Sequence, residues 1–264
     1  MIGSFLTVLK IGGNILNDET TLSRALDEFA RLSGPKILVH GGGRAATDLA
    51  ERFDIPQKMI EGRRVTDEQT LQVAIMVYGG LINKTLVAKL QARGTNAIGI
   101  GGADLDVIRA KRRSPDPIDY GWVGDVTTVR GEALLHLLNE GATPVIAPLS
   151  HDGNGTLLNT NADTIAQEVA CALAKTFPTR LVYSFEMSGV LESPSNPDSV
   201  IPTLTCSQFE QLRSRGLITG GMVPKLDNAF KAIQRGIRVV MIGKADRIGD
   251  LISGSDGTRC VHEE

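Results

Sequence analysis

Short apolar runs alternate along the chain with longer segments in which apolar residues recur every three or four positions. The short runs predict strands at residues 5–11, 36–40, 96–100, 142–148, 180–185 and 238–243. The longer segments predict helices at residues 20–32, 44–53, 67–93, 130–140, 162–175, 206–215 and 222–235. This alternation is typical of an α/β fold, a three-layer αβα sandwich around a mainly parallel central sheet.

Two stretches interrupt the alternation. Residues 101–128 contain two prolines, several charges and short strand-like pieces, so we predict a hairpin insertion or a mobile flap there. Residues 192–200 predict a surface loop. We expect two lobes, residues 1–150 and 151–264, that share one continuous sheet and bind ligands at the carboxyl ends of its strands.

The composition indicates a protein that acts on small molecules. A chain of 264 residues that is 42% hydrophobic can bury a large core. Its net charge of −2 gives no electrostatic reason to expect nucleic acid as a partner. The apolar runs are far shorter than the ~20 residues of a membrane span, and the first residues do not resemble a secretion signal. We therefore expect a cytoplasmic protein that binds neither nucleic acid nor a membrane.

The positions of cysteine and histidine argue against a metal site. Cys171, Cys206 and Cys260 are far apart and form no CxxC pair, so neither a disulfide framework nor a zinc site is expected. The four histidines are equally scattered. We expect no metal ion held by protein side chains alone.

Two glycine-rich loops follow the first two predicted strands. The segment "GGGRAA" (41–46) satisfies the dinucleotide pattern G-x-G-x-x-A, which leaves an NAD(P)-binding oxidoreductase as a rival function. However, the first strand has its own loop, "LKIGGN" (9–14), which adds Lys10. Two glycine loops on neighbouring strands, one with a cation, suit a polyphosphate chain better. No Walker loop is present in the sequence, and we expect His40 to be a packing residue at the strand end.

Three further segments have unusual polar residues. "GRRVTD" (62–67) sets two arginines before a helix start, where Thr66 or Asp67 is the expected cap. "LLNTNADTIA" (157–166) gathers two asparagines and an aspartate in a turn before a helix. "LITGGMVPKLDNA" (217–229) puts Lys225 in the first turn of a helix, where a cation opposes the helix dipole. An anionic ligand beside Lys225 would compensate for that opposition.

Taken in chain order, these motifs resemble the amino acid kinase family, and within it the enzymes that phosphorylate N-acetylglutamate in arginine biosynthesis. The resemblance extends from Val8 to about Thr258. Its motifs are "LKIGGN", "VHGGG", "GRRVT", "NTNADT", "SGVL" and "ITGGMVPK". Each motif is weak alone, whereas six in the right order are specific. The dinucleotide interpretation accounts for only one of them.

The resemblance implies transfer of the γ-phosphoryl group of ATP, with Mg²⁺ carried by the nucleotide, to the side-chain carboxylate of an N-acylglutamate. It implies that Lys10 and Lys225 flank the transferred group and that Asp163 holds both lysines. A carboxylate nucleophile with a pKa near ~4.3 is already ionised at pH 7, so we expect Asp163 to organise charge rather than accept a proton. The presence of all three residues argues against a catalytically inactive amino-acid sensor.

The resemblance also assigns binding residues. Backbone amides of the two glycine loops are expected to cradle the phosphates, and those of the second loop also contact the substrate; these residues are Gly12, Gly13, Gly42 and Gly43. Arg64 and Asn159 match positions that hold the substrate α-carboxylate. The positions that match nucleotide contacts are Glu186, Ser188, Gly189, Leu217 and Thr219.

Several features leave alternatives open. Glu186 replaces the aspartate that relatives have, which leaves its contact with the nucleotide or Lys225 undecided. Arg44 and Arg63 add positive charge near the substrate positions, either as solvated residues or as partners of a second carboxylate. In the second case the substrate is N-succinyl-L-glutamate rather than N-acetyl-L-glutamate. About five residues precede the first strand, so we expect no feedback inhibition by arginine.

The long helical segment 67–93 indicates an assembly. Val73, Met76, Leu81, Leu86 and Leu90 are among its apolar positions, and the segment is longer than one lobe normally needs. We expect part of this apolar surface to form a homodimer contact. Core packing within one chain is the alternative explanation.

Overall fold

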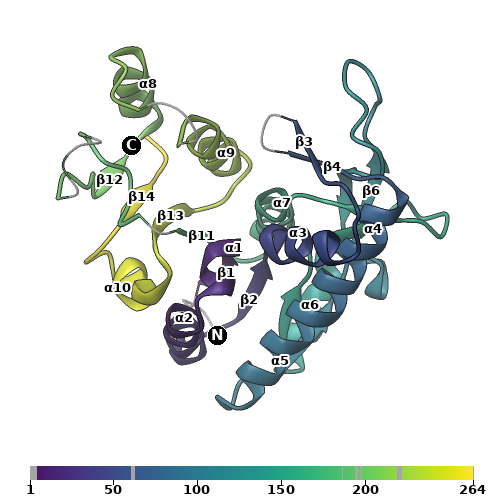
Figure 1. The fold of residues 1–264 in the computed structure, drawn as a ribbon. Coiled ribbons are helices and arrows are strands. Elements are labelled where there is room, and N and C mark those ends of the chain that lie inside the picture. The colour runs from purple at the N-terminus through teal and green to yellow at the C-terminus, as the bar shows by residue number, and fades with distance from the viewer. Residues whose placement is uncertain are drawn as a thin grey trace.

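An eight-stranded sheet forms the centre of the molecule (Figure 1). The computed structural model describes residues 5–60, 63–185, 187–193, 196, 198–218 and 222–263. In spatial order the strands are β12 (Thr203–Leu204), β14 (Thr258–Cys260), β13 (Val239–Lys244), β11 (Thr179–Phe185), β1 (Leu6–Ile11), β2 (Lys36–His40), β8 (Thr143–Ile146) and β5 (Ala97–Ile100). Neighbouring strands are parallel except β13 and β14. The predicted parallel sheet is therefore confirmed.

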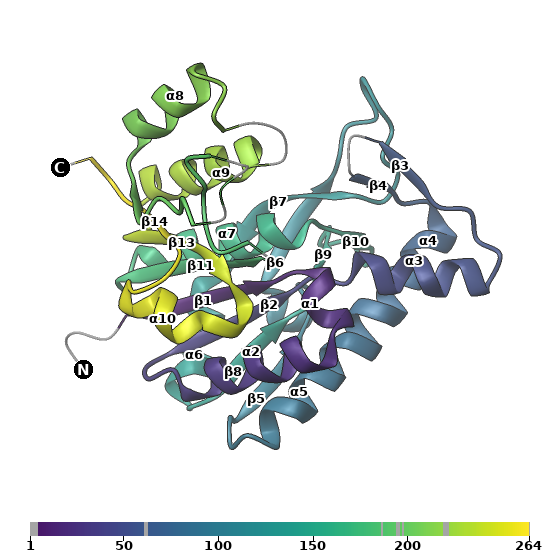
Figure 2. The ribbon, with the colours of Figure 1, turned by 60° about the vertical axis from the view of Figure 1, so that its left-hand side comes forward.

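Helices cover both faces of this sheet, which confirms the three-layer arrangement (Figures 1 and 2). One apolar cluster joins the sheet to α6 (Gly131–Asn139), α7 (Ala162–Ala174), α8 (Cys206–Ser214) and α9 (Met222–Gln234). The other joins it to α2 (Glu19–Arg31), α3 (Gly43–Arg52), α10 (Ile248–Ser253) and the long helical segment described below. Because side chains alternate along a strand, Val8 belongs to the first cluster and Leu9 to the second.

The predicted helix at 67–93 is one continuous helical segment with a wide middle turn. It consists of α4 (Glu68–Ala74), the π-helix η1 (Ile75–Ile82) and α5 (Asn83–Gln91). Asp67 caps its first turn by accepting a hydrogen bond of 2.8 Å from the Thr70 amide. By length and composition alone, Glu68–Gln91 meets the requirements for a membrane span. In this fold Val77 and Leu86 on one of its faces are buried in the second apolar cluster.

The interruption predicted at 101–128 is a hairpin that belongs to a second sheet. Its strands are β6 (Ile108–Arg112) and β7 (Gly124–Val129), preceded by η2 (Asp104–Asp106). This four-stranded sheet also contains β9 (Leu149–His151) and β10 (Leu157–Asn159). A separate pair, β3 (Lys58–Ile60) and β4 (Arg63–Val65), lies near the hairpin in both views (Figures 1 and 2).

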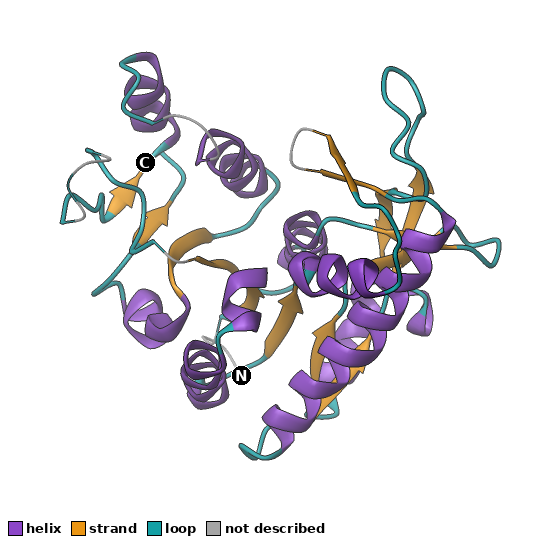
Figure 3. Cartoon of the chain, viewed as in Figure 1, coloured by secondary structure: helices purple, strands orange, loops and turns teal. Residues whose placement is uncertain are grey.

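The remaining elements are short. They are α1 (Gly13–Asn17), directly after β1, and η3 (Ala245–Arg247), directly after β13. Leu191, just before the stretch predicted as a surface loop at 192–200, forms an isolated antiparallel bridge with Val200 at the end of that stretch. Figure 3 shows how the central strands are enclosed by helices, whereas the second sheet lies toward one end of the molecule.

Candidate active site

Lys10 and Asp163 meet at the carboxyl end of the central strand β1. Lys10 is the fifth residue of β1 and shares the strand face of Val8, which is the face covered by α7. Its side chain is therefore directed toward the start of α7, and its Nζ lies 2.7 Å from Oδ1 of Asp163. Lys10 is only 8% exposed. The local fold thus brings together two predicted residues that are far apart in sequence.

The position of Asp163 is determined by a helix cap. Asn161 is the N-cap of α7, and its Oδ1 accepts hydrogen bonds from the amides of Asp163 and Thr164 at 2.8 and 3.1 Å. Asp163 is the second residue of the helix, where the helix dipole favours a negative charge. The first turn of α7 therefore places the Asp163 carboxylate next to the Lys10 side chain.

Lys225 lies at the same end of the sheet, where it contacts the aromatic ring of Phe185. The Nζ of Lys225 is 3.8 Å from the centroid of the Phe185 ring, and the Nζ of Lys10 is 5.6 Å from the same centroid. Phe185 is the last residue of β11, which pairs with β1. Cation–π attraction to one ring therefore helps to place both ammonium groups at adjacent strand ends.

The two predicted glycine loops also lie side by side. β1 and β2 are paired in parallel, and the pairing continues past His40 because the Gly41 amide donates to Ile11 O at 3.0 Å. Gly12 is the N-cap of α1, and Gly42 is the N-cap of α3. The first amides of a helix have no acceptor within it, so Gly12, Gly13, Gly42 and Gly43 carry donors suited to an anion.

Gly42 cannot be replaced without strain. Its φ angle of 149° is one that residues with a side chain rarely adopt. A Cβ atom at this position would lie 2.3 Å from Cδ1 of Ile82 and 3.1 Å from the Tyr78 ring. Because Tyr78 and Ile82 both belong to η1, the π-helix forms the floor under the second glycine loop.

Arg64 is anchored beside Gly43. Its Nη2 donates to Gly43 O at 2.7 Å and to Thr47 Oγ1 at 2.8 Å, and its Nη1 donates to Gln57 Oε1. These contacts join β4 to the first turns of α3. The guanidinium group is therefore held in one place next to the glycine loop rather than extended into solvent.

Asn159 is joined to the same region by Thr66, the residue after β4. Its Nδ2 donates to Thr66 Oγ1 at 2.9 Å. The amide of Trp122, in the hairpin between β6 and β7, donates to Thr66 O at 2.6 Å, and the Asn159 amide donates to Trp122 O at 2.9 Å. Asn159 on β10 thus contacts the residue that follows β4, the strand of Arg64, and the hairpin is attached alongside.

Sequence reasoning did not identify Tyr78. This residue is 4% exposed, and burial raises the pKa of its hydroxyl, whereas the charge and hydrogen bond of Arg64 act in the opposite direction. No motif marks Tyr78, because it occupies an ordinary apolar position of the predicted helix 67–93. Its contacts with Gly42 and Arg64, which form only in the folded chain, reveal its place in the site.

The residues predicted to contact the nucleotide are in the carboxyl-terminal half of the chain. Two of them, Glu186 and Thr219, are outside the described residues. Gly189 follows β11, and a Cβ atom there would lie 2.7 Å from Thr258 Oγ1. The same hydroxyl accepts from the Val190 amide at 2.8 Å, which fixes the segment that includes Ser188 against β14. Leu217 follows α8, and its amide donates to Leu212 O at 3.0 Å.

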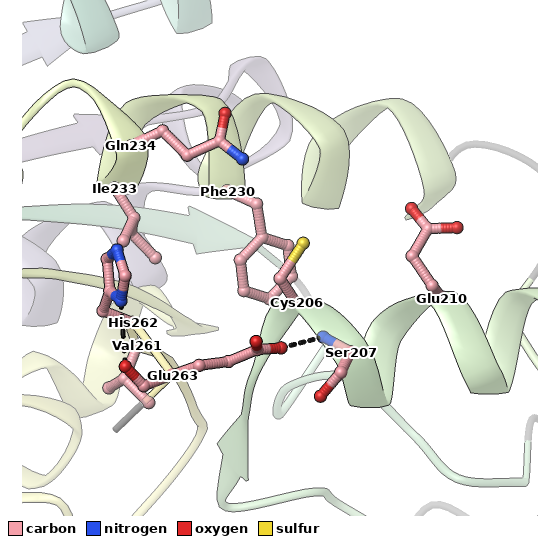
Figure 4. Close-up of a pocket in the computed structure, with 9 residues that line it drawn as sticks. All are labelled: Cys206, Ser207, Glu210, Phe230, Ile233, Gln234, Val261, His262 and Glu263. Carbon is pink, nitrogen blue, oxygen red and sulfur yellow. Dashed lines mark hydrogen bonds between the residues drawn. The ribbon is translucent and has the colours of Figure 1, made fainter.

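A cavity of ≈ 310 Å³ lies apart from these residues, between α8, α9 and the end of the chain (Figure 4). Its floor includes Phe230 and Ile233, and the Glu263 carboxylate at its edge accepts from the Ser207 amide at 2.6 Å. None of the predicted site residues lines it. In the part of the chain that the structure describes, no group of three His, Cys, Asp or Glu side chains is arranged to hold a metal ion.

Known proteins have similar sequences and a similar fold. A protein named acetylglutamate kinase from Bacteroides thetaiotaomicron is 53% identical over 254 residues, which cover 96% of this chain and 97% of that protein. Another protein of that name, from Cytophaga hutchinsonii, is 50% identical and covers 97% of this chain and 98% of its own. Carbamate kinase from Giardia lamblia has the same fold, with a TM-score of 0.71 at 13% identity and full coverage of both chains.

The family profile covers most of the structure described above. It is that of the amino acid kinase family, and it matches residues 5–243. The match includes both glycine loops, the ion pair of Lys10 with Asp163, and Lys225 in α9. Given these features and this coverage, the chain belongs to the amino acid kinase family.

Proposed function

We propose that this protein transfers the γ-phosphoryl group of MgATP to the γ-carboxylate of N-acetyl-L-glutamate in arginine biosynthesis. The products are the acyl phosphate and ADP. Two relatives that are 53% and 50% identical over nearly the whole chain carry the name acetylglutamate kinase. The observation that carries the proposal is the gathering of two lysines and an aspartate at the ends of β1, β11 and α7.

The proposed roles follow from the charges in the reaction. A carboxylate attacks a phosphoryl group that is itself anionic, so the site must hold two mutually repelling anions in line and neutralise the equatorial oxygens. Lys10 and Lys225 provide the positive charge, and Asp163 holds Lys10 at 2.7 Å. A contact of Asp163 with Lys225 is part of the proposal. No general base is required, because the nucleophile is already ionised.

The glycine loops fit the phosphates of ATP. The second loop requires a bare backbone at Gly42, because a Cβ atom there would meet Ile82 at 2.3 Å, whereas a Cβ atom on Gly12 would make only an ordinary contact of 3.6 Å with Lys10 Nζ. The amides of Gly12, Gly13, Gly42 and Gly43 then donate to the phosphates and to the transferred group. When bound, Mg²⁺ arrives with the nucleotide and offsets part of its phosphate charge.

Substrate and nucleotide are proposed to occupy different halves of the chain. Residues 1–150 bind the acylglutamate and form the dimer contact, with Arg64 and the amides of Gly42 and Gly43 as ligands, and Asn159 reaches the α-carboxylate from just beyond this lobe. Residues 151–264 bind the nucleotide. Its contacts are proposed to come from Glu186, Ser188, Gly189, Leu217 and Thr219.

The two candidate substrates differ in their acyl group, which is acetyl in one and succinyl in the other. Arg44 and Arg63 are exposed near Arg64, and either one provides positive charge for a second carboxylate, as in N-succinyl-L-glutamate. Trapping of the acyl phosphate with hydroxylamine compares the two substrates directly. We expect higher kcat/KM with the acetyl compound. A clear preference for the succinyl compound would assign the extra arginines to substrate recognition, and lack of product with both would refute the kinase.

The hairpin between β6 and β7 is proposed to cover the acylglutamate and exclude water, because an acyl phosphate is prone to hydrolysis. Its attachment through Trp122 to Thr66 and Asn159 supports this role. Hydrogen exchange of amides in residues 112–123 should slow when N-acetylglutamate and a non-hydrolysable ATP analogue are added. Unchanged exchange would contradict a covering role.

We also propose a cytoplasmic homodimer that forms through the outer face of the helical segment 68–91. Met76 and Leu81 on this face are 49% and 62% exposed, which is unusual for large apolar side chains. Leu81→Glu should shift the sedimentation coefficient from that of a dimer to that of a monomer. Phe53→Glu, which changes another exposed apolar residue, is the control and should leave the dimer intact.

Thermal-shift measurements distinguish the kinase from the other functions considered. MgATP should raise the melting temperature and NAD should not, whereas an NAD(P)-dependent oxidoreductase would show the opposite. An amino-acid sensor would bind N-acetylglutamate without releasing ADP. ADP release that depends on both MgATP and N-acetylglutamate is expected only from the kinase.

A further inference from the structure

His40 lies at the centre of a buried string of hydrogen bonds under the second glycine loop. It is the last residue of β2 and has no exposed surface. Its Nδ1 is 2.7 Å from Gly41 O, and its Nε2 is 3.2 Å from Nδ2 of Asn83. The same Nδ2 is 2.9 Å from Val145 O on β8. The string therefore runs from the glycine loop to the neighbouring strand.

The two ends of this string are backbone carbonyl groups, those of Gly41 and Val145, and they determine the direction of every hydrogen bond between them. A backbone carbonyl only accepts, so the Asn83 amide group must donate to Val145 O, and its second hydrogen faces His40 Nε2. Nε2 is then the acceptor nitrogen of the ring, and Nδ1 carries the hydrogen that is donated to Gly41 O. The contacts thus specify one tautomer of a neutral imidazole.

The surroundings keep the ring neutral. Burial lowers the pKa of His40 to about 4. Asn83 is 1% exposed, and a Cβ atom on Gly99 would lie 2.0 Å from Asn83 Oδ1, so β5 leaves room for this amide only because residue 99 is glycine. A simple packing residue would not require such a sealed polar environment.

The geometry of the peptide group connects His40 to the amide of Gly42. In a trans peptide the C=O of Gly41 and the N–H of Gly42 point in opposite directions. His40 shares the strand face of Leu38, on the side of α5, so the Gly41 carbonyl is directed to that side. The Gly42 amide is consequently directed to the opposite side, where Lys10 meets Asp163.

We propose that His40 is a positioning residue for phosphoryl transfer: its Nδ1–H fixes the Gly41 carbonyl and thereby aims the Gly42 amide at the transferred group. The Gly41 amide is held from the other direction by Ile11 O at 3.0 Å, so both sides of this residue are fixed. The inference rests on the proposed kinase reaction. It assigns His40 a function beyond packing at the strand end.

Two substitutions of His40 distinguish its proposed role in orienting the Gly42 amide from a role in packing alone. The side-chain nitrogen of asparagine occupies the place of Nδ1 and can still donate to Gly41 O, whereas the amide of glutamine occupies the place of Nε2 and cannot. Both remove the ring, so both should lower the melting temperature. We expect His40→Asn to retain kcat within about three-fold and His40→Gln to lose about ten- to a hundred-fold, since a misdirected donor loses part of the effect of a removed one. Equal kcat losses, or a larger loss in His40→Asn, would overturn the proposal.

A second measurement uses the unmodified protein and does not depend on either variant folding. Nitrogen-15 NMR of labelled histidine distinguishes the two neutral tautomers, and the other three histidines are assigned by substituting each with glutamine. The proposal requires hydrogen on Nδ1 of His40, and hydrogen on Nε2 alone would overturn it. Kinase activity of the unmodified protein is measured first. If this activity is absent, the proposed function is refuted. If the protein is active but has the other tautomer, or if the two variants lose kcat equally, only the role of His40 is refuted.

Discussion

The Nζ of Lys10 lies 2.7 Å from Oδ1 of Asp163, so an ion pair joins the carboxyl end of β1 to the first turn of α7. The side chains of the pair are 10% and 30% exposed. Without its partner the buried lysine would destabilise the protein and lose its fixed position, because its charge would be left uncompensated and poorly hydrated. This pair therefore links the packing of the central layer to the proposed chemistry.

Asp163→Asn tests whether the charge at this position organises the lysines. The amide has nearly the same shape but no negative charge, so we expect kcat to fall about 10²-fold, within the range for lost electrostatic stabilisation. ADP release at saturating substrates measures the effect. Glu168→Gln is a matched control on the same helix, because it disrupts the surface pair with Arg235 at 2.5 Å and should leave kcat nearly unchanged.

Gly42→Ala tests the need for a bare backbone in the second loop. The φ angle of 149° and the contact of 2.3 Å with Ile82 both oppose a side chain. We expect a loss of about 2–4 kcal/mol in the free energy of unfolding together with a large loss of kcat. Gly131→Ala at the start of α6 is the control, since its Cβ would meet only ordinary contacts of 3.5 Å or more. Urea unfolding that is equally affected in both variants would contradict this interpretation.

Arg64→Ala tests the assignment of substrate binding. Loss of a charge-assisted hydrogen bond of about 1.5–3 kcal/mol corresponds to an increase of roughly 10- to 100-fold in KM for N-acetylglutamate, with KM for ATP little changed. Arg52→Ala, an exposed residue at the end of α3, should leave both KM values as they are. An equal increase in both KM values would place Arg64 in structural support rather than in substrate recognition.

Acid should destabilise the protein through His40. Its pKa is lowered from 6.5 to about 4 by burial, so below pH 6.5 the unfolded chain binds a proton that the folded chain does not. The stability contributed by the neutral ring is present above pH 6.5 and is lost as the pH falls through about 4. This loss amounts to about 3 kcal/mol. Urea unfolding of His40→Asn should show a smaller decrease over this pH range than the unmodified protein, and identical pH profiles would contradict the account.

The sequence was sufficient to predict the main layers of the fold because strands buried on both faces are continuous apolar runs. β1 and β2 are examples, and both were predicted to within a residue. Strands of three residues, such as β9 and β10, are too short to show a period. Their pairing depends instead on residues that come together only in the folded chain.

The site was predictable where a residue belongs to a motif and unpredictable where it acts through tertiary contact. Lys10 and Asp163 were proposed from motifs, and the fold pairs them. The contacts of Arg64 with Gln57 and Thr47 depend on how β4 lies against α3, which no local pattern encodes. His40 and Asn83 likewise looked like unrelated residues, because they are 43 positions apart in the sequence and only the packing of α5 on the sheet joins them.

The most direct test of the central claim is the rate of acyl phosphate formation by Lys10→Ala and Lys225→Ala with MgATP and N-acetylglutamate. Each lysine is proposed to neutralise charge in the transition state, so its removal should lower kcat by at least about 10²–10³-fold while the circular dichroism spectrum stays unchanged. The unmodified protein must form the trapped hydroxamate under the same conditions. Near-normal turnover in either folded variant would contradict the role assigned to that lysine, and no hydroxamate from the unmodified protein would contradict the proposed function itself.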